Sequence, residues 1–136
     1  GAVIRSGEYL LIERAPEEEH AGGTLAFPGG KVEASPGVDD PIESTARREL
    51  AEEVGIDVGS VKYVRSRTFE TDTGEQCINV VTLCEYQGGK AHPRSPDEVS
   101  AVHWLSADEI RSRESVPDFL KLDVERMEMF RQSPME

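Results

Sequence analysis

The stretch that most constrains the fold runs from about residue 42 to residue 54. It is rich in strong helix formers, it contains no glycine or proline, and Gly55 follows at the position that often ends a helix. The segments before and after it are short and rich in apolar or β-branched residues. One central helix among strands therefore predicts a mixed sheet with helices packed on its faces.

The expected elements follow in the order β-β-β-α-β-β-β-α-α. Apolar and β-branched runs predict strands at residues 2–4, 9–12, 25–27, 61–71, 77–86 and 99–105. Turn residues at 6–8 and 72–74 predict two β-hairpins. Ser106 and Glu109 form the pattern of a capping box that opens a short helix, and residues 115–118 open a last one. Residues 34–41 are expected to be a loop.

Composition narrows the class of protein. A chain of 136 residues fits one domain, residues 1–136, and a net charge of −12 argues against binding to a nucleic-acid backbone. No apolar run is long enough to span a membrane, and no secretory signal is visible. The two cysteines, Cys77 and Cys84, lie about 23 Å apart if their strand is intact, so they are expected to be buried free thiols in a reducing cytoplasm.

Three glutamates of the central helix carry the strongest chemical signal. Glu49, Glu52 and Glu53 fall within a 100° arc of one face, and Leu50 and Val54 fall on the adjacent arc, which can pack on the sheet. Like charges at this spacing destabilise a helix by about 0.2–0.5 kcal/mol per pair, and they face the negative end of the helix dipole. A solvated acidic face is the ordinary explanation of such a segment. A bound divalent cation is the alternative, because Mg²⁺ takes carboxylate oxygens.

The surrounding residues favour the cation. The segment from Arg48 to Ile56 resembles the second half of the Nudix box, R-E-U-x-E-E-x-G-U, at every fixed position. The segment from Phe27 to Glu33 is similar to the Phe-Pro-Gly-Gly-Lys lead-in of MutT-like members. Trp104-Leu105, followed by residues 108–110, resembles the usual end of that fold. The chain is thus identified as a member of the Nudix hydrolase family, which implies an α/β/α sandwich over nearly its whole length.

The box departs from the family pattern at one place. Arg48 lies 18 positions after Gly30, four more than the family spacing, and the extra residues fall in the loop 34–41. The position of the first box glutamate holds Asp40, although Asp39 can equally occupy it. The role of this position is therefore open, and the resemblance is firmest from Arg48 onward.

The resemblance implies a Mg²⁺- or Mn²⁺-dependent hydrolase in which Glu49, Glu52 and Glu53 hold the metal. Arg48 would orient these glutamates, while its ordinary explanation is an ion pair with Glu52. The general base is either a glutamate of the helix or Glu98 on a later loop, which read alone is a surface acid.

Substrate contacts are expected from Arg14, Lys31 and the backbone at Gly29 and Gly30. Each of the two cations also has a plain interpretation as an exposed side chain. Phe27 is expected in the core rather than against a base, and none of the three histidines is assigned a function. Dimers are common in the family, so a homodimer is an open option.

The substrate is expected to be a small nucleotide. The proline and tyrosine that the family places after the box in ADP-ribose and dinucleoside polyphosphate hydrolases are absent, and so is the SQPWPFPxS motif of the NADH type. A nucleoside triphosphate or a related nucleotide remains by elimination. Two alternatives stay open: a nucleotide-sugar or ADP-ribose pyrophosphatase, and a non-catalytic domain that senses a nucleotide.

Overall fold

The computed structural model describes residues 1–15, 24–32 and 37–132, which contain six strands and three helices. The strands are β1 (Ala2–Arg5), β2 (Glu8–Arg14), β3 (Leu25–Ala26), β4 (Asp57–Glu70), β5 (Gln76–Gly88) and β6 (Val99–Ser106). The helices are α1 (Pro41–Val54), α2 (Ala107–Ser112) and α3 (Asp118–Gln132). This is the element order predicted from the sequence.

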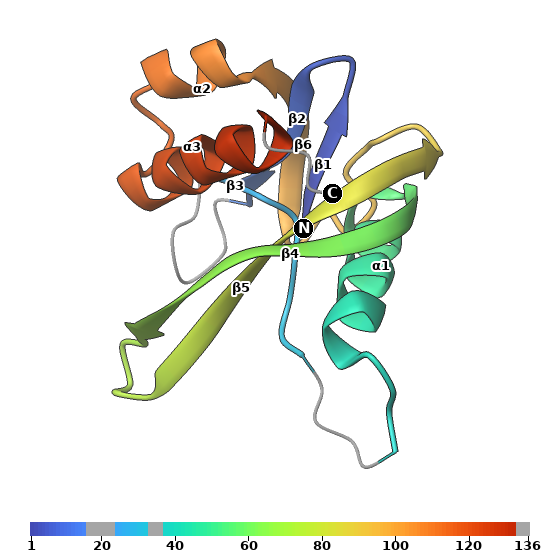
Figure 1. The fold of residues 1–136 in the computed structure, drawn as a ribbon, viewed down its shortest axis with the longest axis vertical. Coiled ribbons are helices and arrows are strands. Elements are labelled where there is room, and N and C mark those ends of the chain that lie inside the picture. Colours follow the sequence, from blue (N-terminus) through green and yellow to red (C-terminus); the bar gives the residue numbers. More distant parts are fainter. Residues whose placement is uncertain (16–23, 33–36, 133–136) are drawn as a thin grey trace.

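All six strands join one mixed sheet. The strand order is β3-β2-β1-β5-β4, and β6 also pairs with β2. The β1–β5 pair is parallel, and the other pairs are antiparallel. β4 and β5 form a long hairpin that extends away from the rest of the sheet (Figure 1).

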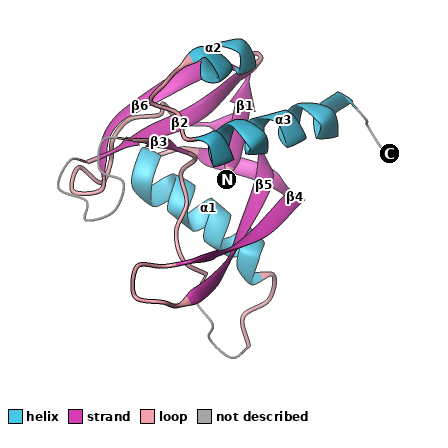
Figure 2. Cartoon of the chain, turned by 90° about the vertical axis from the view of Figure 1, so that its left-hand side faces the viewer, coloured by secondary structure: helices cyan, strands magenta, loops and turns pink. Residues whose placement is uncertain are grey.

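Helices cover both faces of the sheet (Figures 1 and 2). On one face, α1 contributes Ala46, Leu50 and Val54 to a buried cluster with Val3, Leu10, Ile12 and other strand residues. On the opposite face, α2 and α3 contribute Ile110, Leu120, Val124 and Met127 to a second cluster with Tyr9, Leu11 and Leu105. The predicted α/β/α arrangement is confirmed, and α1 packs against the sheet through the first of these clusters.

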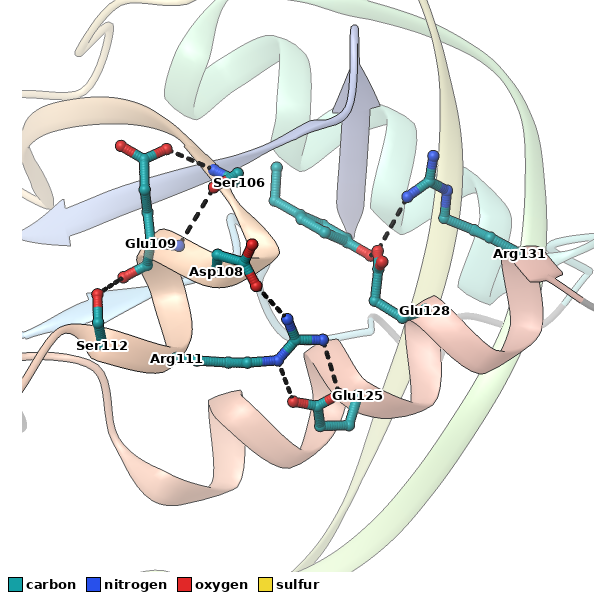
Figure 3. A network of polar contacts seen from close by, with 9 residues as sticks. Ser106, Asp108, Glu109, Arg111, Ser112, Glu125, Glu128 and Arg131 are labelled. Atoms are coloured by element: carbon teal, nitrogen blue, oxygen red, sulfur yellow. Dashed lines mark hydrogen bonds and ion pairs between the residues drawn. The ribbon is translucent and has the colours of Figure 1, made fainter.

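The local signals in the sequence explain the first hairpin. Ser6 and Gly7 both have positive φ values, 51° and 79°, and Arg5 pairs with Glu8 across them. A two-residue turn of this kind matches the twist of the strands it joins. At the start of α2, Ser106 and Glu109 form the expected capping box (Figure 3).

Polar contacts attach α3 to its neighbours. Arg111 of α2 lies between Asp108 and Glu125, with Nη1 2.7 Å from Asp108 Oδ1 and Nη2 3.0 Å from Glu125 Oε1 (Figure 3). Asp123 is almost fully buried and accepts two hydrogen bonds from Arg67 of β4. These contacts fix the helix layer on the face opposite α1.

Several details differ from the expectations. Helix α1 begins at Pro41, which was expected in the preceding loop, because proline fits the first helical position where no N–H is required. β4 begins four residues earlier than predicted. Both cysteines are free, but only Cys84 is buried while Cys77 is half-buried. None of the helices in the described ranges has the length and apolar content needed to cross a bilayer.

Candidate active site at the C-terminal end of helix α1

The last two turns of α1 present the predicted glutamates while the sheet holds the helix. Leu50 and Val54 are fully buried against the sheet, as their position on the helix predicted. Their packing orients the adjacent arc, which carries Glu49 and Glu53, towards the segment that follows β3. The geometry of the glutamates is therefore set by the core beneath them.

Glu53 is the most buried of the three glutamates, with 6% of its surface exposed. Its Oε1 accepts a hydrogen bond from the backbone N–H of Gly29 at 3.3 Å. Burial, followed by the charge of Glu49, raises the pKa of Glu53 from 4.5 to about 7. The negative charge of Glu98 raises this pKa further, whereas the Gly29 hydrogen bond and the positive charge of Arg14 lower it. Gly29 thus contacts Glu53 directly, and three other predicted site residues act on its pKa through their charges.

Gly30 lies directly against Glu49. A Cβ atom on Gly30 would stand 2.5 Å from Cδ of the Glu49 carboxyl group, which is closer than atoms can approach. Only glycine fits here without displacing that carboxylate. The predicted lead-in segment therefore lies over the glutamate helix, with backbone rather than side chains facing Glu49 and Glu53.

Glu52 and Arg48 form the outer part of the site. Nη1 of Arg48 lies 3.7 Å from Glu49 Oε1 and 3.9 Å from Glu52 Oε1. The side chain of Glu52 is 57% exposed, against 15% for Glu49. Ion pairs of this length near the surface contribute little to stability. The helix therefore carries one buried, one half-buried and one exposed glutamate rather than three equivalent ones.

The loop that connects β5 to β6 closes the end of α1. Three of its residues donate hydrogen bonds to consecutive helix carbonyls: Arg94 Nη1 to Ala51 O (3.0 Å), Ser95 Oγ to Glu52 O (3.1 Å), Arg94 N to Glu53 O (2.9 Å) and His92 N to Val54 O (3.1 Å). Gly55, in the left-handed conformation, donates to Ala51 O and Leu50 O. Sequence reasoning missed Arg94 and Ser95, because nothing in a proline-containing loop indicates which helix end it meets.

The remaining predicted residues are distributed unevenly. Glu98 is an exposed residue of this loop, and its carbonyl accepts the N–H of Ala15, next to Arg14, at 3.0 Å. Lys31 is exposed beside Gly30. Asp40 is exposed at the opposite end of α1, nine residues and therefore about 14 Å along the axis from Glu49. Asp40 is thus remote from the carboxylates at the other end.

The donor set suits a hard divalent cation. Within the described ranges, no three His, Cys, Asp or Glu side chains converge closely enough to hold a metal ion by themselves. Mg²⁺, however, usually takes only one or two carboxylates and completes its shell with water and substrate phosphate oxygens. Glu49 and Glu53 are two such carboxylates at one end of α1, and the charge of Glu49 raises the pKa of Glu53.

Comparison with known proteins decides the family. The NUDIX domain model matches residues 1–123. The chain belongs to the NUDIX domain family. Its fold agrees: the MutT NUDIX hydrolase from Burkholderia pseudomallei superposes with a TM-score of 0.76 at 25% identity, covering 92% of each chain. The MutT protein from Methanosarcina mazei Go1 gives the same TM-score at 23% identity, over 96% of this chain and 91% of the other.

Relatives of this NUDIX chain carry names from two groups. A MutT-like protein of Streptomyces ambofaciens is 34% identical over 114 residues, which cover 83% of this chain and 65% of the relative. The NAD-capped RNA hydrolase NudC of Stutzerimonas stutzeri is 28% identical over 121 residues, which cover 87% of this chain and 40% of the relative. The chain thus spans less than two thirds of either curated relative.

Proposed function

We propose that this NUDIX chain hydrolyses a phosphoanhydride bond in a nucleoside diphosphate derivative, with Mg²⁺ or Mn²⁺ held by Glu49, Glu52 and Glu53. The observation that carries the proposal is the environment of Glu53. A carboxylate that is 6% exposed and adjacent to a second carboxylate is costly to keep charged. Perturbed acids of this kind concentrate at functional sites, and a divalent cation would remove the penalty.

The cation, when bound, would neutralise charge on the phosphates and lower the pKa of a coordinated water. The protein side chains have separate tasks. Arg48 orients Glu49 and Glu52, and Gly29 holds one oxygen of Glu53. Arg14, Lys31 and the Gly29–Gly30 backbone contact the phosphates. Glu53 or Glu98 accepts the proton of the attacking water as the general base.

A nucleoside triphosphate or a related small nucleotide is the proposed substrate. The MutT names among the relatives and structural neighbours support it. Other neighbours have different ligands: one is the NUDIX domain of Shewanella oneidensis NrtR complexed with ADP ribose, at 18% identity and a TM-score of 0.71. A pyrophosphatase acting on ADP-ribose or a nucleotide sugar is therefore the second candidate. The net charge of −12 and the missing SQPWPFPxS motif disfavour NAD-capped RNA, despite the NudC relatives.

A panel of nucleotides tests the proposal and the substrate class together. Nucleoside triphosphates, ADP-ribose, a nucleotide sugar and NAD are incubated with the chain and Mg²⁺, and the release of nucleoside monophosphate, pyrophosphate and phosphate is measured. We expect one class to be cleaved, and EDTA to abolish the reaction. Glu53→Gln should lower kcat about 10²- to 10⁴-fold, the range for loss of a base or an essential charge.

Glu43→Gln is the matched control, because it removes the same charge from the first turn of the same helix. Its kcat should stay within about twofold of the parent chain. Turnover at background with every nucleotide, together with nucleotide binding, would instead support the sensing alternative. Equal activity in Glu53→Gln and the parent chain would overturn the proposal.

Two expectations remain predictions: that residues 1–136 act as one domain, and that the chain forms a homodimer. Sedimentation equilibrium of the chain tests the second directly.

A further inference from the structure

We propose that Arg94 is a positioning residue for the hydrolysis reaction: it fastens the loop that carries Glu98 onto the C-terminal turn of α1. The inference rests on the proposed function, and it adds a residue outside the box. Arg94 itself is exposed and contacts the helix backbone rather than the glutamate side chains. Its effect on the reaction would therefore pass through Glu98.

The loop is attached to the C-terminal turn of α1 by Arg94 and Ser95. Arg94 uses two donors, its backbone N–H to Glu53 O at 2.9 Å and Nη1 to Ala51 O at 3.0 Å. Ser95 adds a third bond, from Oγ to Glu52 O at 3.1 Å. These bonds fall on the carbonyls of the very turn that carries Glu52 and Glu53. These hydrogen bonds therefore fix the position of the loop relative to the turn that carries Glu52 and Glu53.

Glu98 is in turn attached to Ser95 and to the sheet. The carbonyl of Ser95 accepts the N–H of Glu98 at 2.9 Å and the N–H of Val99 at 2.8 Å. Val99 is fully buried and begins β6, and the carbonyl of Glu98 accepts the N–H of Ala15. Glu98 is therefore held between the Arg94–Ser95 attachment and the sheet. The charge of Glu98 raises the pKa of Glu53, which agrees with a position near the same end of α1.

Arg94 also supplies a charge that α1 lacks. The last turn of the helix contains no basic residue of its own, although it carries glutamates at the negative end of the helix dipole. The guanidinium of Arg94 donates to the Ala51 carbonyl, so it places a positive charge at this end of the helix although Arg94 is not part of it. Loss of the side chain would remove one of the four hydrogen bonds that attach the loop to the helix carbonyls, together with the positive charge, and so would loosen the attachment. A displacement of about 1 Å at a reacting group can cost about 10²-fold in rate.

The test compares three variants of the chain with the substrate found in the panel. Arg94→Ala should lower kcat about 10- to 100-fold, the range for residues that orient a catalytic group, with KM within about twofold. Arg94→Lys keeps the charge and one donor, and it should restore part of the loss. Arg47→Ala is the matched control, because Arg47 of α1 also donates to a backbone carbonyl, Gly59 O at 2.9 Å, away from Glu98. The control should keep its kcat.

A double-mutant cycle separates positioning from general stability. In a Glu98→Gln background, Arg94→Ala should cause less than a twofold further loss, since its target is already removed. Independent, multiplying losses would overturn the inference, as would Arg94→Ala lowering kcat while Glu98→Gln does not. Urea unfolding of each variant identifies losses of activity that come from unfolding of the chain. If Arg94→Ala is unfolded, Arg94→Lys takes its place in the cycle. If Glu53→Gln inactivates the chain and Arg94→Ala does not, the inference fails while the proposed function stands.

Discussion

The two ends of helix α1 are built in opposite ways. At the C-terminal end, the carbonyls from Leu50 to Val54 all accept hydrogen bonds, and Gly55 takes the left-handed conformation that closes the helix. At the N-terminal end, Asp40 precedes the helix with a φ of 48°, and its side chain makes no capping hydrogen bond. One end is enclosed by other segments, whereas residues 37–42, the described residues at the other end, are exposed.

The enclosed end of α1 is the end that carries the glutamates proposed to bind the metal. The segment that matches the family pattern residue for residue is the enclosed end, where Glu49 and Glu53 lie under the Gly29–Gly30 backbone. The segment that departs from the pattern, with Asp40, lies about 14 Å away along the helix. A position that few contacts constrain tolerates change, whereas one enclosed on several sides does not. The predicted four-residue insertion in the loop 34–41 lies partly outside the described residues and stays a prediction.

The largest expected effect concerns pH at the enclosed end. The pKa of Glu53 rises from 4.5 in the unfolded chain to about 7, so its contribution to stability is full below pH 4.5 and is lost as the pH rises through 7. The loss is about 3 kcal/mol in cation-free protein. Urea unfolding with EDTA at several pH values measures it, as the difference between Glu53→Gln and the parent chain.

The difference in the free energy of unfolding between the two chains reports on Glu53 alone, because both chains share the other acids. Glu53→Gln should gain stability relative to the parent chain between pH 4.5 and 7, and Mg²⁺ should reduce the gain at pH 7 and above. A difference that stays constant over this range would show that Glu53 ionises normally, and the site would lose its distinguishing feature.

The next effect compares glycines near the two ends. Gly55→Ala forces alanine into a φ of 72° and places a Cβ 2.5 Å from Cε1 of His92. We expect a loss of about 2–3 kcal/mol, from the left-handed conformation and the displaced His92 hydrogen bond to Lys90 O. Gly37→Ala, with a φ of 84° and no atom within 4 Å, should lose only about 1–2 kcal/mol. Equal losses in urea unfolding would mean that the loop does not constrain the C-terminal end.

The smallest effect is expected at Asp40. Asp40→Asn removes a charge that favours the helix N-terminus, so the free energy of unfolding should fall by no more than about 0.5 kcal/mol. The nucleotide-hydrolysis kcat should stay within about twofold, because Asp40 is remote from the carboxylates. A tenfold loss of kcat would place Asp40 in the site and remove the contrast between the two ends.

Local patterns predicted much of this molecule, and distant contacts explain what they missed. Turn residues such as Ser6-Gly7, the capping box at Ser106 and the buried Leu50–Val54 stripe act through neighbours in the chain. Helical geometry likewise placed the three glutamates on one arc. Their different burial, 6% exposed for Glu53 and 57% for the Glu52 side chain, depends on which of them the Gly29–Gly30 segment covers.

The attachment of Arg94 to α1 joins residues 43 positions apart. No periodicity or motif in the sequence indicates such a contact, because it depends on how the β5–β6 loop folds back over the helix. The metal-binding role of the glutamates was inferred from resemblance, and the structure adds the burial and charge environment that makes the role physically reasonable.

The affinity of the chain for Mn²⁺, measured by the electron paramagnetic resonance signal of the free ion, tests the central claim most directly. Glu53→Gln and Asp40→Asn remove one negative charge each, from opposite ends of the same helix. We expect Glu53→Gln to weaken Mn²⁺ binding at least about tenfold and Asp40→Asn to leave it unchanged. Equal weakening in both variants, or none in Glu53→Gln, would contradict a cation site at the C-terminal end of α1.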